Sequence, residues 1–229
     1  QGKRVLLVDL DPQGHLTIGL GFSKKVPVTL KNMLENIVMG IKFDPREVIL
    51  HHEEGVDVIP SNKLLSGLDV SLIMAEDREI ILREYLMLLK EDYDFMIIDC
   101  MPSLGMLTIN ALTAADSILI PMEPEYYAAD GLMELLKVYS AIKAKFNPDL
   151  KIEGIVFTFD TPTFNNSKRN KKAVISTYGD KIRIFKESIP RAVTIAETAS
   201  EGISIFAYDG SGKGAQSYQK LVEGVLDHA

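Results

Sequence analysis

The stretch Lys3-Arg4-Val5-Leu6-Leu7-Val8-Asp9-Leu10-Asp11-Pro12-Gln13-Gly14 decides the fold class of this chain. An apolar run leads directly into two carboxylates and is then broken by a proline and a glycine. In a parallel α/β sheet, this pattern is typical of a buried strand that ends at the edge where ligands bind. Two neighbouring acids are costly to hold at such an edge unless a cation or a catalytic water shares them. The alternative is a strand followed by an ordinary Asp-Pro turn.

A second apolar run that ends in an acid lies further along the chain. It reads Asp94-Phe95-Met96-Ile97-Ile98-Asp99 and is broken by Cys100-Met101-Pro102-Ser103-Leu104-Gly105. An apolar strand ending in aspartate is how a Walker B element looks, with its acid on the hydration shell of Mg²⁺. The two junctions together predict a ligand site at one edge of a parallel sheet.

Alternating strands and helices predict an α/β fold, with a parallel sheet covered by helices on both faces. We expect Thr29 to be the N-cap of the first long helix. Strands are predicted at residues 4–9, 48–50, 56–59, 95–99, 117–121, 151–157 and 182–185. Helices are predicted at residues 30–38, 66–73, 77–90, 106–114, 128–146, 166–177 and 214–228. No repeat or linker stands out, so a single domain spanning residues 1–229 is expected.

Composition indicates a globular domain that carries its own core. The chain has 229 residues and 46% hydrophobic residues, with a mean hydropathy of +0.08, which argues against disorder. We see no signal peptide and no apolar run that could span a bilayer, so no membrane partner is expected. The single cysteine, Cys100, excludes a disulfide framework and is expected to be a small buried residue. The four histidines form no metal-binding pattern.

Several further blocks extend the pattern of the two acid junctions. They are Leu16-Thr17, Gly19-Leu20-Gly21, Val58-Ile59-Pro60-Ser61-Asn62, Tyr126-Tyr127-Ala128 with Gly131-Leu132, Ile189-Pro190-Arg191 with Ala196-Glu197, and Tyr208-Asp209 followed by Lys213-Gly214-Ala215 and Tyr218. In this order and spacing the set resembles the ParA/Soj family of deviant-Walker P-loop ATPases, over nearly the whole chain. The resemblance implies a P-loop NTPase-like fold, with ATP and Mg²⁺ as cofactors.

The resemblance also implies roles for the acids and the loop after the second strand. Asp11 would position or activate the attacking water, and Asp9 would support Mg²⁺ and the phosphates. Asp99 would hold Mg²⁺ through a water molecule. Ser103 and Gly105 would belong to a switch that senses the γ-phosphate.

Other implied roles fall in the second half of the chain, and here the sequence departs from the family. Pro190 and Arg191 would line the adenine pocket, but Ala192 stands where the family commonly has asparagine. Met101 takes the place of the first of two usual prolines in the switch. Tyr126 and Tyr127 are expected to pack near a dimer face.

The largest departure is the P-loop itself. No G-x-x-x-x-G-K-[ST] motif occurs in the chain, and the nearest lookalike, Gly210-Ser211-Gly212-Lys213-Gly214, is interpreted as a helix N-terminus. In relatives the P-loop lies just before the segment that corresponds to Gly2-Lys3-Arg4-Val5. We therefore expect the first strand, P-loop and first helix to be missing from this chain, because it is part of a longer protein, because they are cleaved off, or because the gene product lacks them. That strand would lie beside the one that ends at Asp99, and its absence would leave two apolar strand edges unpaired.

Charge is unevenly distributed along the chain. The net charge is −7, yet residues 151–191 carry nine Lys/Arg against four Asp/Glu, which gives +5 there and −7 − 5 = −12 elsewhere. The cluster Lys168, Arg169, Lys171 and Lys172 opens a predicted helix. It is either a solvated helix face or, as the resemblance implies, a surface for non-specific DNA binding by a homodimer.

The leading hypothesis is a cytoplasmic, nucleoid-associated partition ATPase of chromosomes or plasmids. ATP would drive dimerisation and DNA binding, and a ParB-like partner would stimulate hydrolysis. One rival is a chain without a P-loop that acts as a non-enzymatic interaction module or as a dominant partner of a full-length ParA protein. A second is a MinD-like membrane ATPase, which the acids Glu223 and Asp227 in the last helix disfavour. A third is a small-molecule ligase or synthetase with the same fold.

Overall fold

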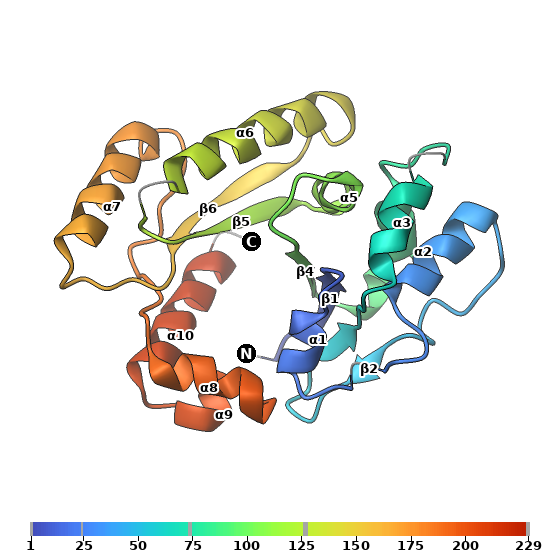
Figure 1. Cartoon of the computed structure of the whole chain (residues 1–229), viewed down its shortest axis with the longest axis horizontal. Helices are drawn as coiled ribbons and strands as arrows, with labels where there is room; N and C mark the ends of the chain where they lie inside the picture. The colour runs from blue at the N-terminus through green and yellow to red at the C-terminus, as the bar shows by residue number, and fades with distance from the viewer. Residues whose placement is uncertain (1, 24, 73–74, 126–127, 228–229) are drawn as a thin grey trace. The chain divides into compact units, whose positions relative to one another are not determined.

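The stretch that opened the sequence analysis forms the central strand of a sheet. A computed structural model describes residues 2–23, 25–72, 75–125 and 128–227 of the chain (Figure 1). Two compact units are present, and each is described by itself. Unit 1 comprises residues 1–115, 142–148 and 199–203, and unit 2 comprises residues 116–141, 149–198 and 204–229.

Unit 1 is built around a four-stranded sheet in the order β2-β3-β1-β4. The strand β1 pairs in parallel with both β3 and β4, whereas the short strand β2 is antiparallel to β3. The strands are β1 (Val5–Leu10), β2 (Leu50–His51), β3 (Asp57–Ile59) and β4 (Phe95–Cys100). The helices are α1 (His15–Gly19), α2 (Leu30–Met39), α3 (Leu65–Leu72), α4 (Ile81–Met87), the 3-10 turn η1 (Lys90–Asp92) and α5 (Met106–Ala114).

The core of unit 1 lies between β1 and the helices that follow each strand. Leu6, Val8 and Leu10 of β1 are fully or almost fully buried and pack with Leu30 and Leu82 in one apolar cluster. Burying side chains of this size stabilises the unit by about 1.5–3 kcal/mol each. This packing fixes β1, and so it also fixes the acids at the end of the strand.

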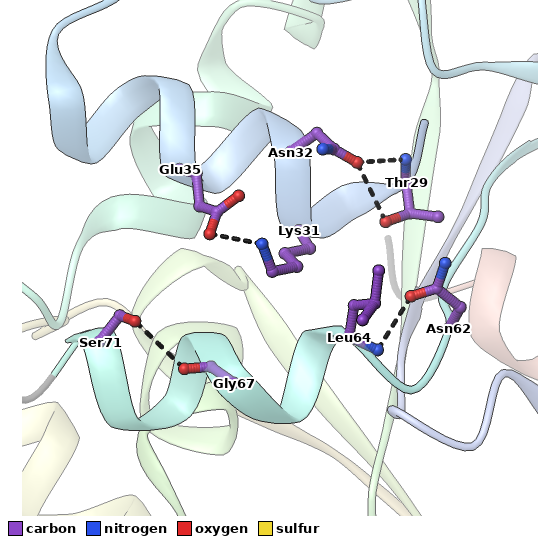
Figure 2. A network of polar contacts seen from close by, with 8 residues as sticks. All are labelled: Thr29, Lys31, Asn32, Glu35, Asn62, Leu64, Gly67 and Ser71. Carbon is purple, nitrogen blue, oxygen red and sulfur yellow. Dashed lines mark hydrogen bonds and ion pairs between the residues drawn. The ribbon is translucent and has the colours of Figure 1, made fainter. Parts of the chain in front are cut away.

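The start of α2 is held by a side-chain cap, and a side-chain hydrogen bond also closes the turn before α3 (Figure 2). The Asn32 side-chain oxygen accepts a hydrogen bond from the Thr29 backbone N–H at 2.9 Å, and Thr29 is confirmed as the N-cap of α2. The Asn62 side-chain oxygen accepts a hydrogen bond from the Leu64 backbone N–H at 3.0 Å, just after β3. The Asn62 hydrogen bond therefore holds the turn between β3 and α3 in one conformation.

Unit 2 contains a second, two-stranded parallel sheet, β5-β6. The long helix α6 runs along β5 and β6 in Figure 1, and its Leu132 and Leu136 pack against Ile120 and Ile155 of the sheet. The elements that begin in this unit are β5 (Ser117–Met122), α6 (Ala128–Lys145), β6 (Lys151–Phe157), α7 (Asn165–Tyr178), α8 (Val193–Glu201), α9 (Ile205–Asp209) and α10 (Lys213–Leu226). The lookalike at residues 210–214 is confirmed as the start of a helix, with Gly212 as the N-cap of α10.

Several predicted boundaries are wrong for local reasons. The strand predicted at 48–50 is shifted to β2, because residues 44–49 form a turn in which the Ile49 N–H donates to the Arg46 carbonyl. The helix predicted from residue 77 begins only at Ile81, because Asp77 has a φ of +49°, which a right-handed helix cannot contain. The strand predicted at 182–185 is a single bridge between Ile184 and Ile155. The helix α8 was not predicted.

Two of the edge strands, β4 and β5, carry exposed apolar residues. Among the described residues, β4 pairs only with β1, and β5 pairs only with β6. The side chains of Ile97 on β4 and Leu119 on β5 are exposed to 55% and 40%. The segment expected ahead of Gln1 and the single-domain organisation stay predictions.

Candidate functional site

The two acid junctions meet at one edge of the sheet in unit 1. Asp9 on β1 and Asp99 on β4 are direct partners in the parallel register. Partial desolvation, followed by the negative charges of Asp9 and Asp11, raises the pKa of the Asp99 carboxyl. Asp9 is fully buried, and this burial, which outweighs its hydrogen bonds, raises its pKa. The structure therefore places Asp9 and Asp99 side by side, where their negative charges are unfavourable without a cation.

The carboxylate of Asp9 is occupied by hydrogen bonds from its own surroundings. Oδ2 accepts from the Thr17 backbone N–H at 2.9 Å and from the Thr17 hydroxyl at 2.6 Å. Oδ1 accepts from the Asp11 backbone N–H at 3.2 Å. Asp9 thus holds the loop after β1 through buried hydrogen bonds. The side chains of Asp11 and Asp99 are less buried than that of Asp9.

The loop after β1 is a tight turn that presents Asp11. The Asp11 Oδ1 accepts from the Gln13 N–H at 2.8 Å, and its carbonyl accepts from the Gly14 N–H at 2.9 Å. Gly14 has a φ of +65°, and a Cβ at this position would lie 2.8 Å from the Ser61 carbonyl oxygen. Glycine is therefore required, because the turn passes directly against the end of β3.

The predicted switch residues follow β4 in the same unit. Ser103 is exposed, and its carbonyl accepts a hydrogen bond from the Thr108 hydroxyl. Gly105 is the N-cap of α5. Cys100, expected to be buried, is exposed at the open edge of β4. Partial desolvation and then the negative charge of Asp99 raise the pKa of the Cys100 thiol to about 12.

The carboxylates fit Mg²⁺ only as part of a larger set of ligands. No group of three or more His, Cys, Asp or Glu side chains that could hold a metal occurs in the part of the chain that the structure describes. Mg²⁺ is commonly held by one or two carboxylates, with the remaining positions filled by water and substrate phosphates. Asp99 can supply such a carboxylate, whereas the oxygens of Asp9 already accept three hydrogen bonds.

The predicted adenine-binding residues lie in unit 2. Pro190 forms a bridge with Asp160, and the Arg191 N–H donates to the Asp160 carbonyl at 3.1 Å. Pro190 lines an open pocket of about 170 Å³ together with Ser188 and Lys213. Arg191 is exposed, and its guanidinium lies 5.7 Å from the centre of the Phe159 ring.

The structure separates the four basic residues of α7. Lys168, Arg169 and Lys172 are exposed. Lys171 instead forms an ion pair with the buried Asp160 at 2.7 Å and donates to the Ser188 hydroxyl at 2.8 Å. Its ammonium group also lies 5.1 Å from the centre of the Phe157 ring.

Asp160 shows why the ion pair forms. Burial alone raises its pKa, but the hydrogen bonds from Lys171 and Ser167, with the Lys171 charge, outweigh burial and hold the pKa below its usual value. Lys171 is therefore a structural residue of unit 2, and three basic side chains of the cluster face solvent.

Thr17 and Ser61 lie in blocks that carry the family resemblance, but the sequence alone assigned neither of them a role. Both are buried, and the Thr17 hydroxyl accepts from the Ser61 backbone N–H at 3.0 Å. The signal available was a threonine within the short apolar segment that follows the acid turn. Tyr126 and Tyr127, expected near a dimer face, lie outside the described residues.

The architecture defines the class of protein. The family model described as "AAA domain" matches residues 1–152. A solved structure of cobyrinic acid a,c-diamide synthase from Mycobacterium smegmatis with bound ADP and magnesium superposes with a TM-score of 0.84 and 34% identity, over 100% of this chain and 83% of that one. Septum site-determining protein MinD from Pyrococcus horikoshii, 24% identical, shares the fold with a TM-score of 0.75, over 99% of this chain and 86% of that one. The fold is an α/β P-loop NTPase-like fold with a mostly parallel sheet flanked by helices.

Curated relatives define the family within that class. The chain is 41% identical to sporulation initiation inhibitor protein Soj of Bacillus subtilis, over 98% of this chain and 87% of that protein. It is 40% identical to chromosome partitioning protein ParA of Myxococcus xanthus, over 96% of this chain and 76% of that protein. The chain belongs to the ParA/Soj family of partition ATPases.

Proposed function

We propose that this protein hydrolyses ATP in DNA partition, with Asp11 and Asp99 acting at the carboxyl edge of the unit 1 sheet. The observation that supports this most is the in-register pairing of Asp9 with Asp99, beside a turn that holds Asp11 at the same edge. Asp11 would orient the attacking water, and Asp99 would hold Mg²⁺ through a water molecule. Bound Mg²⁺ would neutralise charge that develops on the phosphates during transfer.

Pro190 and Arg191 would contact adenine, and Ser103 and Gly105 would respond to the terminal phosphate. Because the 229 residues contain no G-x-x-x-x-G-K-[ST] motif, we assign none of them to a P-loop.

The proposed partners are DNA, a second copy of the chain and a ParB-like protein. Lys168, Arg169 and Lys172 are exposed on one helix of a unit whose 151–191 segment carries +5, in a chain of net charge −7. Such a local excess favours phosphate contacts that do not depend on sequence. A dimer would present the surface twice. A cytoplasmic, nucleoid-associated location follows from this proposal, and none of the described helices is long and apolar enough to cross a bilayer.

The hydrolytic role is tested by replacing Asp11 and a matched aspartate. Asp44 also precedes a proline, and its Oδ1 accepts from the Arg46 N–H at 3.0 Å in the same kind of turn as Asp11. We expect Asp11→Ala to lower kcat by about 10² or more with little loss of ATP binding, because losing a water-orienting group leaves binding contacts intact. Asp44→Ala should hydrolyse at the wild-type rate. An Asp11→Ala protein with wild-type kcat would refute the role.

The DNA-binding role is tested by the salt dependence of affinity. Each phosphate contact that is lost should reduce the slope of log K against log salt by about 0.9. Replacing Lys168, Arg169 and Lys172 together by alanine should therefore flatten the slope by about 2.7 if each makes one contact. An unchanged slope would show that this face does not contact DNA.

The alternative is a non-enzymatic interaction module, which the lack of a P-loop motif in these residues favours. Isothermal titration with Mg·ATP separates the two functions. A protein that binds no nucleotide but still binds DNA would support the module, whereas nucleotide binding followed by turnover supports the ATPase.

A further inference from the structure

A buried threonine hydroxyl joins the ends of two strands beneath the candidate site. Thr17 is 1% exposed and lies in α1, which begins directly after the Asp11 turn. Its hydroxyl donates to Asp9 Oδ2 at 2.6 Å and accepts from the Ser61 backbone N–H at 3.0 Å. The end of β1 and the segment after β3 are therefore connected through one oxygen atom.

The connection continues from Asp9 to Asp11. One carboxylate oxygen of Asp9 accepts hydrogen bonds from the Thr17 hydroxyl and the Thr17 backbone N–H. The other oxygen accepts a hydrogen bond from the Asp11 backbone N–H. A carboxylate held on one side by two donors has little freedom to rotate. The Asp11 N–H, and the turn that starts there, are thus aligned through Asp9 by Thr17.

To make both hydrogen bonds, the side chain at this position must donate and accept at the same atom. Serine keeps both functions, and valine keeps the volume but neither function. The hydroxyl of Ser61 does not substitute, since its buried Oγ has no hydrogen-bond partner among the described residues. A Cβ at Gly14 would lie 2.8 Å from the Ser61 carbonyl oxygen, so the turn passes close to the segment that the Thr17 hydroxyl holds.

We propose that Thr17 is a positioning residue for Asp11. It acts through Asp9, and it fixes the Asp11 turn against the segment that leaves β3. The inference rests on the proposed role of Asp11 in ATP hydrolysis. A purely structural threonine would affect stability alone, whereas a positioning threonine affects the turn and kcat.

The test compares three variants of the full protein. Thr17→Val removes both hydrogen bonds, and Thr17→Ser retains them. Thr113→Val is the matched control, because Thr113 is also 1% exposed in unit 1 and its hydroxyl has no hydrogen-bond partner in the described part of the chain. Two readouts are measured on each: steady-state ATP hydrolysis, and amide hydrogen exchange at Asp11, Gln13 and Gly14.

For Thr17→Val we expect kcat to fall about tenfold or more, KM to change less than about twofold, and turn amides to exchange about tenfold faster. Thr17→Ser and Thr113→Val should resemble wild type in both readouts. Wild-type kcat and exchange in a folded Thr17→Val protein would overturn the proposal. If Thr17→Val does not fold, a loss of kcat or of turn protection in Thr17→Ser overturns it instead, and wild-type values support it.

The two readouts separate this inference from the proposed function. If the wild-type protein does not hydrolyse ATP, the proposed function fails, and the exchange of the turn amides still decides whether Thr17 positions Asp11. If wild type hydrolyses ATP and Thr17→Val does so equally well, only the role of Thr17 fails.

Discussion

Lys171 and Lys172 are neighbours in sequence with different environments, so replacing each by methionine separates folding from DNA binding. The Lys171 side chain is 26% exposed and is paired with Asp160, whose side chain is 4% exposed. Removing one partner of a buried ion pair costs about 3–5 kcal/mol. Because Lys171 is partly exposed to solvent, we expect Lys171→Met to cost less, about 2–3 kcal/mol. Lys172 is exposed, so Lys172→Met should change stability by less than about 0.5 kcal/mol.

Thermal unfolding followed by circular dichroism measures the difference. For a chain of this length, 2–3 kcal/mol corresponds to a fall in Tm of about 4–12 °C. The pKa of Asp160 is lowered in the folded state. The ion pair therefore contributes its full stability at pH values above the unfolded pKa of Asp160, about 3.9, and this stability is lost as the pH falls through the lower, folded pKa. The gap between wild type and Lys171→Met should therefore be full at pH 7 and should close in acid.

For DNA binding we expect the opposite order of effects, with Lys172→Met having the larger one. Lys172→Met should flatten the salt dependence by about one phosphate contact, whereas folded Lys171→Met should leave it unchanged. Equal melting temperatures for the two variants would refute the assignment of Lys171 to the fold. A loss of salt dependence in Lys171→Met would show that it reaches DNA despite the ion pair.

Three other changes test the geometry of unit 1 by thermal unfolding. Gly14→Ala should cost about 1–3 kcal/mol, because its φ is +65° and the new Cβ would lie 2.8 Å from the Ser61 carbonyl oxygen; an unchanged Tm would contradict the crowding. Asn110→Ala should cost about 2–4 kcal/mol, because its buried side chain accepts one backbone hydrogen bond and donates two; a loss below about 1 kcal/mol would count against this. Asp99→Asn should stabilise the protein slightly at pH 7, because the raised pKa of Asp99 means that stability present in acid is lost as pH rises through it, and the solvent exposure of Asp99 keeps the gain small; the gain should vanish below pH ~4, and lower stability at pH 7 would refute it.

The acid junctions were predictable because strand ends of a parallel sheet share one edge. The apolar runs before Asp9 and Asp99 indicated buried strands, and the structure pairs these residues directly. The helix predicted at 30–38 is confirmed as α2 for a similar reason, since its apolar period and its cap agree. Local pattern and tertiary structure point the same way at these places.

Other features depended on contacts that a sequence does not show. Which lysine of α7 turns inward is decided by the position of Asp160, eleven residues before Lys171. The helix α8 has β-branched residues in its first turn, such as Val193 and Thr194, which local propensity does not favour. The role of Thr17 depends on Ser61, 44 residues away. For Lys171 and Thr17, a partner that is distant in sequence decides the environment of the side chain.

The alternation of segments between the two units has a practical consequence for dissecting this protein. Unit 1 needs residues 142–148 and 199–203, which follow its main segment by many residues. Within it, the Asn147 side chain donates to the carbonyls of Leu112, Thr113 and Ala115, and the Gly202 carbonyl contacts His52. A fragment cut after Ala115 would lose these contacts and expose the end of α5. Split-protein or truncation experiments should therefore be designed as complementation of two pieces, because no single cut yields either unit intact.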